Sequence, residues 1–242
     1  MEQNRSPFDI FFLSYDEPNA DQNWNSLRQR FPQAKRIHGV DGILSAHKAC
    51  AKLSETPFFF VVDGDNEIHT SFVFHLDFIP EKGACYVWRA LNPVNGLIYG
   101  FGAVKLLDRD LILAKKVMGV DMTTSLGDHY VIRPELASTT RFNSSPYQAW
   151  KSAFRECVKL ASGGIARRKE NESSLRLETW ISVADPKAAF SEWSLRGARC
   201  GKEFATAKIH NAEELAKIND YRWLMAHFRE LYGLGAQLSE RP

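Results

Sequence analysis

The 242-residue sequence predicts an α/β fold, with a mixed, mainly parallel central sheet and a smaller helical C-terminal part. Strand-like and helix-like segments alternate from residue 8 to residue 62, which is the order of a parallel α/β sheet. The third strand-like segment, residues 58–62, is continuously apolar, as expected for a strand covered on both faces. Beyond residue 145, apolar residues recur at helical spacing. We therefore divide the chain into a core, residues 1–145, and a helical part, residues 146–242.

The first strand is predicted over residues 8–15, a segment rich in Phe that ends at the turn-forming sequence DEPN. A helix is predicted to follow this turn. Asn19 or Asp21 can cap the start of the helix, and Pro32 ends it. Residues 35–40 are the second predicted strand, which is closed by an Asp-Gly turn.

A second helix is predicted between the second and third strands. Its apolar positions share one helical face and are Ile43, Ala46, Cys50 and Leu53. The third strand ends at Asp63-Gly64-Asp65. Right-handed crossovers bring the carboxyl ends of parallel strands to one edge of the sheet, where open α/β sheets bind ligands. Because Asp16 and Glu17 follow the first strand, the sequence predicts a cluster of carboxylates at this edge.

The later part of the chain has a mixed order of elements. Strands are predicted over residues 84–91 and 95–106, and a helix over residues 146–161. The polar, glycine-containing residues 162–174 predict a loop. Residues 211–231 predict a final helix or helix pair.

The composition is that of an ordinary globular protein, with 44% hydrophobic and 25% charged residues. The four cysteines form no CxxC pair, which favours reduced thiols. No signal peptide or membrane span is recognisable, so we expect a soluble, cytoplasmic protein that does not bind membranes. Net charge is only +2, yet residues 151–208 carry 12 basic and 7 acidic side chains. This segment is expected to be either a basic surface for a polyanion or a solvated helical face.

Asp63-Gly64-Asp65 is the clearest chemical signal in the sequence. Two carboxylates separated by one residue can point towards a common divalent cation, and the glycine lets the backbone turn sharply. Mn²⁺ and Mg²⁺ prefer such oxygen ligands and bridge readily to a diphosphate. For the tripeptide alone, a turn with two solvated aspartates is the alternative. The buried strand before it favours the metal site, with Asp63 and Asp65 as ligands.

The segment GVDGILSAHKACAKLSETPFFFVVDGDNEI resembles the core of family-2-like glycosyltransferases of the GT-A type, in which an apolar strand ends in Asp-x-Asp. The opening FFLSYDEPNADQNW resembles the first strand and nucleotide loop of the same fold. Together with NPVNGLIYGFGAVKLL and FNSSPYQAWKSAFRECVKLA, these blocks are similar to a group of phage-encoded glycosyltransferases, and the resemblance covers most of residues 8–200. It implies a GT-A-like fold, Mn²⁺ or Mg²⁺ as cofactor and a nucleotide-diphospho-sugar donor, with a UDP-sugar favoured.

The resemblance also implies roles for individual residues. Tyr15, Asp16 and Glu17 lie in the loop that would hold the donor nucleoside, although a capping turn is the alternative for each. Lys48 lies where a basic residue can approach the donor diphosphate. For the neighbouring His47, a packed structural histidine is favoured.

Further candidates follow the predicted metal strand. The resemblance places Gly100 and Gly102 in a glycine-rich block that lines the sugar and acceptor pocket, with a β-bulge as the alternative. An inverting transfer needs a base for the acceptor hydroxyl, and Asp121 is the candidate, ahead of Asp128. Helix capping is the alternative role for Asp121.

The acceptor is the least determined part of the prediction. The similarity to phage proteins and the basic residues Arg167, Arg168 and Lys169 suggest a hydroxymethylated pyrimidine in phage DNA, with residues 146–242 as the acceptor-binding region. Trp150 and Phe154 can stack on bases, but their helical spacing favours a place in the core. Two other functions remain open: a metal-dependent nucleotidyltransferase, and an inactive sugar- or DNA-binding module of the same fold.

Overall fold

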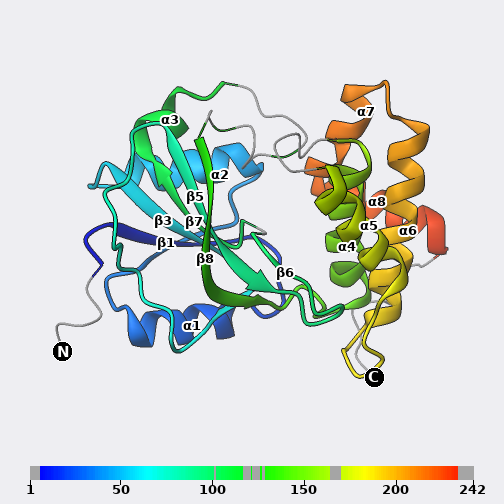
Figure 1. Cartoon of the computed structure of the whole chain (residues 1–242), viewed down its shortest axis with the longest axis horizontal. Coiled ribbons are helices and arrows are strands. Elements are labelled where there is room, and N and C mark those ends of the chain that lie inside the picture. The colour runs from blue at the N-terminus through cyan, green and yellow to red at the C-terminus, as the bar shows by residue number, and fades with distance from the viewer. Residues whose placement is uncertain are drawn as a thin grey trace. The chain divides into compact units, whose positions relative to one another are not determined.

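The computed structural model divides into two compact units (Figure 1). It describes residues 6–100, 102–116, 121, 126, 129–163 and 170–233. Unit 1 contains residues 1–92, 98–118 and 122–141. Unit 2 contains residues 93–97, 119–121 and 142–242. Each unit has a hydrophobic core of its own.

Unit 1 is built on an eight-stranded sheet. The strands are β1 (Asp9–Ser14), β2 (Lys35–His38), β3 (Phe58–Asp63), β4 (Asn66–Ile68), β5 (Ala84–Leu91), β6 (Ile98–Tyr99), β7 (Val104–Asp108) and β8 (His129–Thr140). They lie in the order β2-β1-β3-β7-β5-β8-β4, with β6 paired to β5. β1 is parallel to β2 and β3, and β5 is parallel to β8, whereas β7 lies antiparallel between β3 and β5. The sheet is therefore mixed, and β1, β2, β3, β5 and β8 run in one direction.

Helices cover both faces of this sheet (Figure 1). Side chains alternate between the two faces along a strand. Phe12 and Phe60 therefore pack with Leu27 of α1 (Ala20–Arg30) on one face. Phe11 and Phe59 pack on the other face, where α2 (Ile43–Leu53) and α3 (Arg109–Ala114) lie. Because β1 and β3 are covered on both faces, both are apolar nearly throughout.

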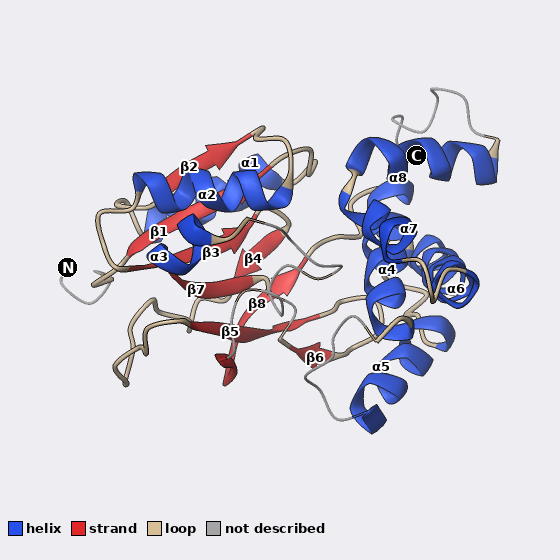
Figure 2. Cartoon of the chain, turned by 90° about the horizontal axis from the view of Figure 1, so that it is seen from above, coloured by secondary structure: helices blue, strands red, loops and turns tan. Residues whose placement is uncertain are grey.

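In unit 2 the described elements are all helical (Figure 2). They are α4 (Pro146–Ala161), α5 (Glu170–Ser182), α6 (Ser191–Ala207), α7 (Ala212–Ala216), the 3₁₀ helix η2 (Lys217–Asn219) and α8 (Tyr221–Tyr232). Ser145 caps α4, accepting from the backbone N–H of Gln148, and Pro146 occupies the first turn. Trp150 and Phe154 are fully buried in the core of this unit. The predicted α/β class with a helical C-terminal part is confirmed.

Two predicted segments need correction. The single strand expected over residues 95–106 is two strands, β6 and β7, because Gly102 adopts a positive φ of 81° that interrupts extended backbone. The loop expected over residues 162–174 contains the start of α5 at Glu170. The sequence prediction also lacked β4, α3, β8 and α6.

All four cysteines are free thiols, as the sequence predicts for a reduced protein. Burial raises the pKa of the Cys50 thiol to about 12, so this group stays protonated near neutral pH. Within the described ranges, no helix has the length and apolar character that crossing a bilayer requires.

Candidate functional site

The loops after β1 and β3 pack against each other at the carboxyl edge of the sheet. A Cβ atom on Gly64 would lie 2.8 Å from Glu17 Oε2 and 2.9 Å from Ser14 Cβ, so the two loops meet at a position where only glycine fits. The Asn23 side chain on α1 donates to the Gly64 carbonyl at 3.0 Å and holds the turn in place. The structure therefore brings Glu17 beside the glycine that Asp63 and Asp65 flank.

The loop after β1 is folded back on itself. The backbone N–H of Tyr15 donates to Glu17 Oε2 at 2.8 Å, which turns this carboxylate towards Gly64. Asp16, between these two residues, is exposed to solvent. The three residues predicted for the nucleoside thus occupy one short loop. Their role in nucleoside binding stays a prediction.

Two basic residues on β2 meet the end of β1 and were not singled out from the sequence. Arg36 Nε donates to Ser14 Oγ at 3.0 Å, and its NH1 donates to Asp21 at 2.7 Å. His38 Nδ1 lies 3.0 Å from the same Ser14 oxygen. Parallel pairing of β1 with β2 produces these contacts, since it sets Ser14 opposite His38.

Asp63 forms an ion pair with a buried lysine. Lys105 Nζ on β7 lies 2.6 Å from Asp63 Oδ1 and donates to the Gly102 carbonyl, also at 2.6 Å. The Lys105 side chain is 3% exposed, whereas that of Asp63 is 39% exposed. In the sequence, the sign of this ion pair is a lysine inside the largely apolar segment VKLLD.

His47 lies on α2 with its ring buried. Its Nδ1 is 2.8 Å from the carbonyl of Ile43. Burial, reinforced by the positive charge of Lys105, lowers the pKa of His47 to about 3. His47 is therefore a neutral, packed residue. Lys48 is half-buried on the same helix, and its approach to a diphosphate stays a prediction.

Asp65 is held from two sides. The amide of Asn66 donates to Asp65 Oδ1 at 2.8 Å. The backbone N–H of Arg141 donates to the Asp65 carbonyl at 2.7 Å. These contacts fix both the backbone and the carboxylate of the second aspartate.

The two candidate glycines have different surroundings. Gly102 lies beside Asp63, because its carbonyl accepts from Lys105, and Ala103 accepts from the Asp63 backbone N–H at 2.9 Å. A Cβ atom on Gly100 would lie 3.3 Å from the side chain of Val87 on β5, so this residue packs closely on the sheet. The structure thus places Gly102 at the carboxylate cluster.

The carboxylates of Asp63 and Asp65 fit a divalent cation whose coordination is completed by a bound nucleotide-sugar donor. Lys105 occupies one oxygen of Asp63, and Asn66 occupies one oxygen of Asp65. In the part of the chain that the structure describes, no three His, Cys, Asp or Glu side chains gather as a metal site. Mg²⁺ and similar ions usually take one or two carboxylates, with water and substrate phosphates as further ligands. The pair matches that donor set.

Asp121, the candidate base, belongs to unit 2 and lies in an ion-pair network. Lys159 Nζ is 3.3 Å from Asp121 Oδ1 and 2.9 Å from Glu156 Oε2. Arg176 lies 2.6 Å from the other oxygen of Glu156. The two carboxylates raise the pKa of Lys159, although burial opposes them. The other candidate base, Asp128, lies outside the described residues.

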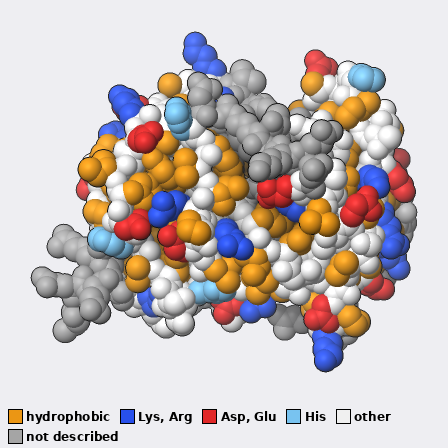
Figure 3. Space-filling view, viewed as in Figure 1, with side chains coloured by type: hydrophobic (Ala, Val, Ile, Leu, Met, Phe, Trp, Pro, Cys, Tyr) orange, Lys and Arg blue, Asp and Glu red, His pale blue; other side chains and the backbone are white. Residues whose placement is uncertain are grey.

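Part of the positive charge in residues 151–208 lies inside unit 2. Lys151, over the ring of Tyr221 at 4.6 Å, is buried, and Lys159 and Arg176 are enclosed by the network above. On the face shown in Figure 3, Lys and Arg side chains are interspersed with Asp and Glu. The basic cluster at residues 167–169 lies outside the described residues.

No family model and no curated protein matches the chain. Among solved structures, it is similar to the mannosyltransferase PcManGT from Pyrobaculum calidifontis, in complex with GDP-Man and Mn²⁺. The similarity covers 96% of this chain and 90% of that chain, with 11% sequence identity and a TM-score of 0.43. A likeness at this level does not assign the chain to a family.

Proposed function

We propose that the chain is a metal-assisted glycosyltransferase of the GT-A type, which moves a sugar from a nucleotide-diphospho-sugar to a hydroxyl acceptor. The observation that carries this proposal is the convergence of Glu17, Asp63 and Asp65 at the carboxyl edge of a mixed α/β sheet. Open α/β sheets bind ligands at this edge. The sequence blocks that resemble GT-A enzymes include both loops of the cluster.

The cluster suggests how the donor would lie. Asp63 and Asp65 would hold Mn²⁺ or Mg²⁺, which when bound neutralises charge on the departing nucleoside diphosphate. Tyr15 and Asp16 would face the nucleoside of the donor. The family resemblance favours a UDP-sugar as that donor. Lys48 would approach the diphosphate.

Sugar transfer makes one bond and breaks one bond at the anomeric carbon. The acceptor oxygen bonds to the anomeric carbon, while the bond from that carbon to the diphosphate breaks and the nucleoside diphosphate leaves with the electron pair. The acceptor proton passes to a base, for which we propose Asp121. Gly100 and Gly102 would line the sugar pocket.

A donor screen tests the proposal. The purified chain is incubated with UDP-sugars and GDP-sugars and with Mn²⁺ or Mg²⁺, and nucleoside diphosphate release is measured. We expect release to require the cation and to fall at least about 100-fold in Asp63→Asn and Asp65→Asn, as when a transition-state charge contact is removed. Asp77→Asn is the matched control, because Asp77 is an exposed carboxylate paired with Arg133. Unchanged release in both site variants would refute the proposed metal site.

The same assay separates the alternative functions. A nucleotidyltransferase would release pyrophosphate from a nucleoside triphosphate instead of a nucleoside diphosphate from a sugar donor. An inactive module would bind the nucleotide sugar in thermal-shift experiments and release nothing, with or without acceptors.

For the acceptor we propose DNA that contains 5-hydroxymethylpyrimidine. The proposal rests on the similarity to phage proteins and on the net basic charge of residues 151–208, part of which is buried in unit 2. Transfer should need the hydroxymethyl group and fall steeply with salt. Charge reversal at Arg167, Arg168 and Lys169 should weaken DNA binding and leave donor hydrolysis unchanged. Transfer to a small sugar, and none to modified DNA at low salt, would refute this acceptor.

A further inference from the structure

Asn66, directly after the carboxylate pair, has a buried side chain whose amide nitrogen and oxygen both have polar partners. Its Nδ2 donates to Asp65 Oδ1 at 2.8 Å. Its Oδ1 accepts from Ser138 Oγ at 3.0 Å and from Thr140 Oγ1 at 2.8 Å. Asn66, Ser138 and Thr140 are all buried, so water does not compete for the two bonds to Oδ1. The network therefore links Asp65 to β8.

These contacts determine which way the amide of Asn66 faces. Two hydroxyl groups that donate to Oδ1 use both of its lone pairs. If the amide turned over, its oxygen would face the Asp65 carboxylate, and two acceptors would be in contact. Antiparallel pairing of β4 with β8 sets Asn66 opposite Thr140, so the backbone brings the amide to these hydroxyl groups. The amide N–H consequently has to point at Asp65.

We propose that Asn66, locked by Ser138 and Thr140, is a positioning residue that orients Asp65 towards the divalent cation of the donor site. This inference rests on the proposed function. Hydrogen bonds to a ligating carboxylate fix its orientation, and their loss typically costs about 10–100-fold in metal affinity. Asn66 supplies such a bond without adding a charge to the site.

Thr139 provides a matched control on the same strand. Successive side chains of a strand point to opposite faces, so Thr139 lies on the face away from Asn66. Its Oγ1 is 2.9 Å from His69 Nε2. Thr139 and Thr140 are 6% and 8% exposed. Replacing either with valine removes one buried hydroxyl, but only Thr140→Val removes a hydrogen bond to Asn66.

The test measures Mn²⁺ binding to the full chain, with and without UDP, from the electron paramagnetic resonance signal of free Mn²⁺. Asn66→Ala should weaken Mn²⁺ binding about tenfold or more. Thr140→Val should weaken it in the same direction. Thr139→Val should leave it unchanged, while its melting temperature falls about as much as that of Thr140→Val. A structural role alone would lower the melting temperatures of both threonine variants without separating their Mn²⁺ affinities.

Three results would overturn the inference in distinguishable ways. Equal Mn²⁺ affinity in Thr139→Val and Thr140→Val would refute it and leave the proposed function intact. Wild-type affinity in Asn66→Ala would do the same. No Mn²⁺ binding by the wild-type chain, with or without UDP, would refute the proposed metal site and this inference together. If Asn66→Ala does not fold, the two threonine variants decide the question.

Discussion

Lys105 places a buried ammonium group against one of the two carboxylates proposed to hold the cation. A buried charge needs a charged or hydrogen-bonded partner, and Lys105 has both in Asp63 and the Gly102 carbonyl. The ammonium therefore competes with a metal ion for Asp63. Metal binding is expected to depend on a donor diphosphate, because the diphosphate contributes further oxygen ligands.

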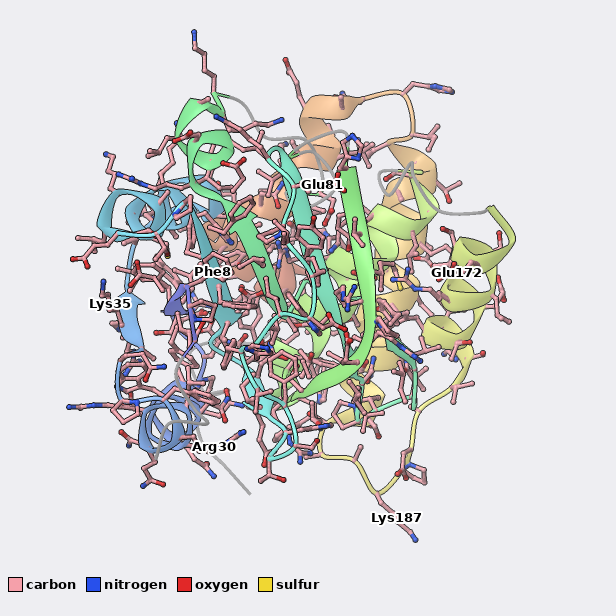
Figure 4. The ribbon with its side chains drawn as sticks, turned by 60° about the vertical axis from the view of Figure 1, so that its left-hand side comes forward. Phe8, Arg30, Lys35, Glu81, Glu172 and Lys187 are labelled. Atoms are coloured by element: carbon pink, nitrogen blue, oxygen red, sulfur yellow. The ribbon has the colours of Figure 1, made fainter. Side chains whose placement is uncertain are left out.

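Replacing Lys105 with methionine tests this competition. Lys105→Met should bind Mn²⁺ without nucleotide about tenfold more tightly, because one opposing charge within hydrogen-bond distance is gone. Lys35→Met is the control, since Lys35, labelled on β2 in Figure 4, pairs with Asp9 at 2.9 Å at the start of β1. Titration with Mn²⁺ measures both variants. Weaker or unchanged binding in Lys105→Met would show that the lysine does not compete.

His47 predicts a pH dependence of stability. Its pKa falls from an ordinary 6.5 to about 3 in the folded chain, so between these values the unfolded state binds a proton that the folded state does not. Protonation of His47 in the unfolded state therefore lowers the free energy of unfolding as the pH falls from about 6.5 towards 3. The free energy of unfolding, measured with urea between pH 7 and pH 4, should fall less steeply with decreasing pH in His47→Leu than in the wild type. The expected difference in slope is on the order of 1 kcal/mol per pH unit. Parallel curves for the two proteins would contradict the burial of a neutral His47.

At the scale of elements, α4 and α6 are in near backbone contact. Gly197 and Gly201, one turn apart on α6, face α4. A Cβ atom on Gly197 would overlap the carbonyl oxygen of Trp150, and one on Gly201 would overlap that of Phe154. Backbone atoms cannot move aside as a flexible side chain can. The glycines therefore set how closely the two helices approach.

Gly197→Ala and Gly201→Ala should each destabilise unit 2, although alanine favours helix formation. The expected cost is about 2–3 kcal/mol, as for overpacking of a close contact. Thr206→Ala, on an exposed part of α6, should change stability by no more than about 0.5 kcal/mol. Denaturant unfolding measures all three. A stabilised glycine variant would show that the helices separate at little cost.

At the scale of the whole molecule, each unit has a separate core. In unit 1, residues on the two faces of the sheet pack with α1 on one side and with α2 and α3 on the other. In unit 2, Trp150, Phe154 and Phe228 form the centre of a helical core. Separate cores predict that a defect in one unit affects that unit first.

Hydrogen exchange tests this independence. In Gly197→Ala, amide protection should fall across α4, α6 and α8, while the amides of β1, β3 and β7 keep wild-type protection. Thr206→Ala should keep protection in both units. An equal loss of protection in both units of Gly197→Ala would show that the chain unfolds as one cooperative body.

The sequence by itself determined the first half of unit 1 and the location of the candidate site. β1, α1, β2, α2 and β3 follow from local patterns: apolar runs, helical spacing, and the turns at DEPN and at Asp41-Gly42. Parallel connections then place Asp63-Gly64-Asp65 and Glu17 at one edge. The sequence did not predict β8, because Arg133, Pro134 and Glu135 interrupt its strand pattern. It did not predict α6, because Gly197 and Gly201 weaken a helix prediction.

Only the tertiary structure decided what surrounds each carboxylate. Lys105 meets Asp63 because β7 pairs antiparallel with β3, and Asn66 meets Ser138 and Thr140 because β4 pairs with β8. These partners are 42, 72 and 74 residues apart in the chain. The residues of one strand do not specify which distant strand it pairs with, because strand preference depends on the surrounding sheet. The charge and the orientation of the site are therefore properties of the assembled sheet.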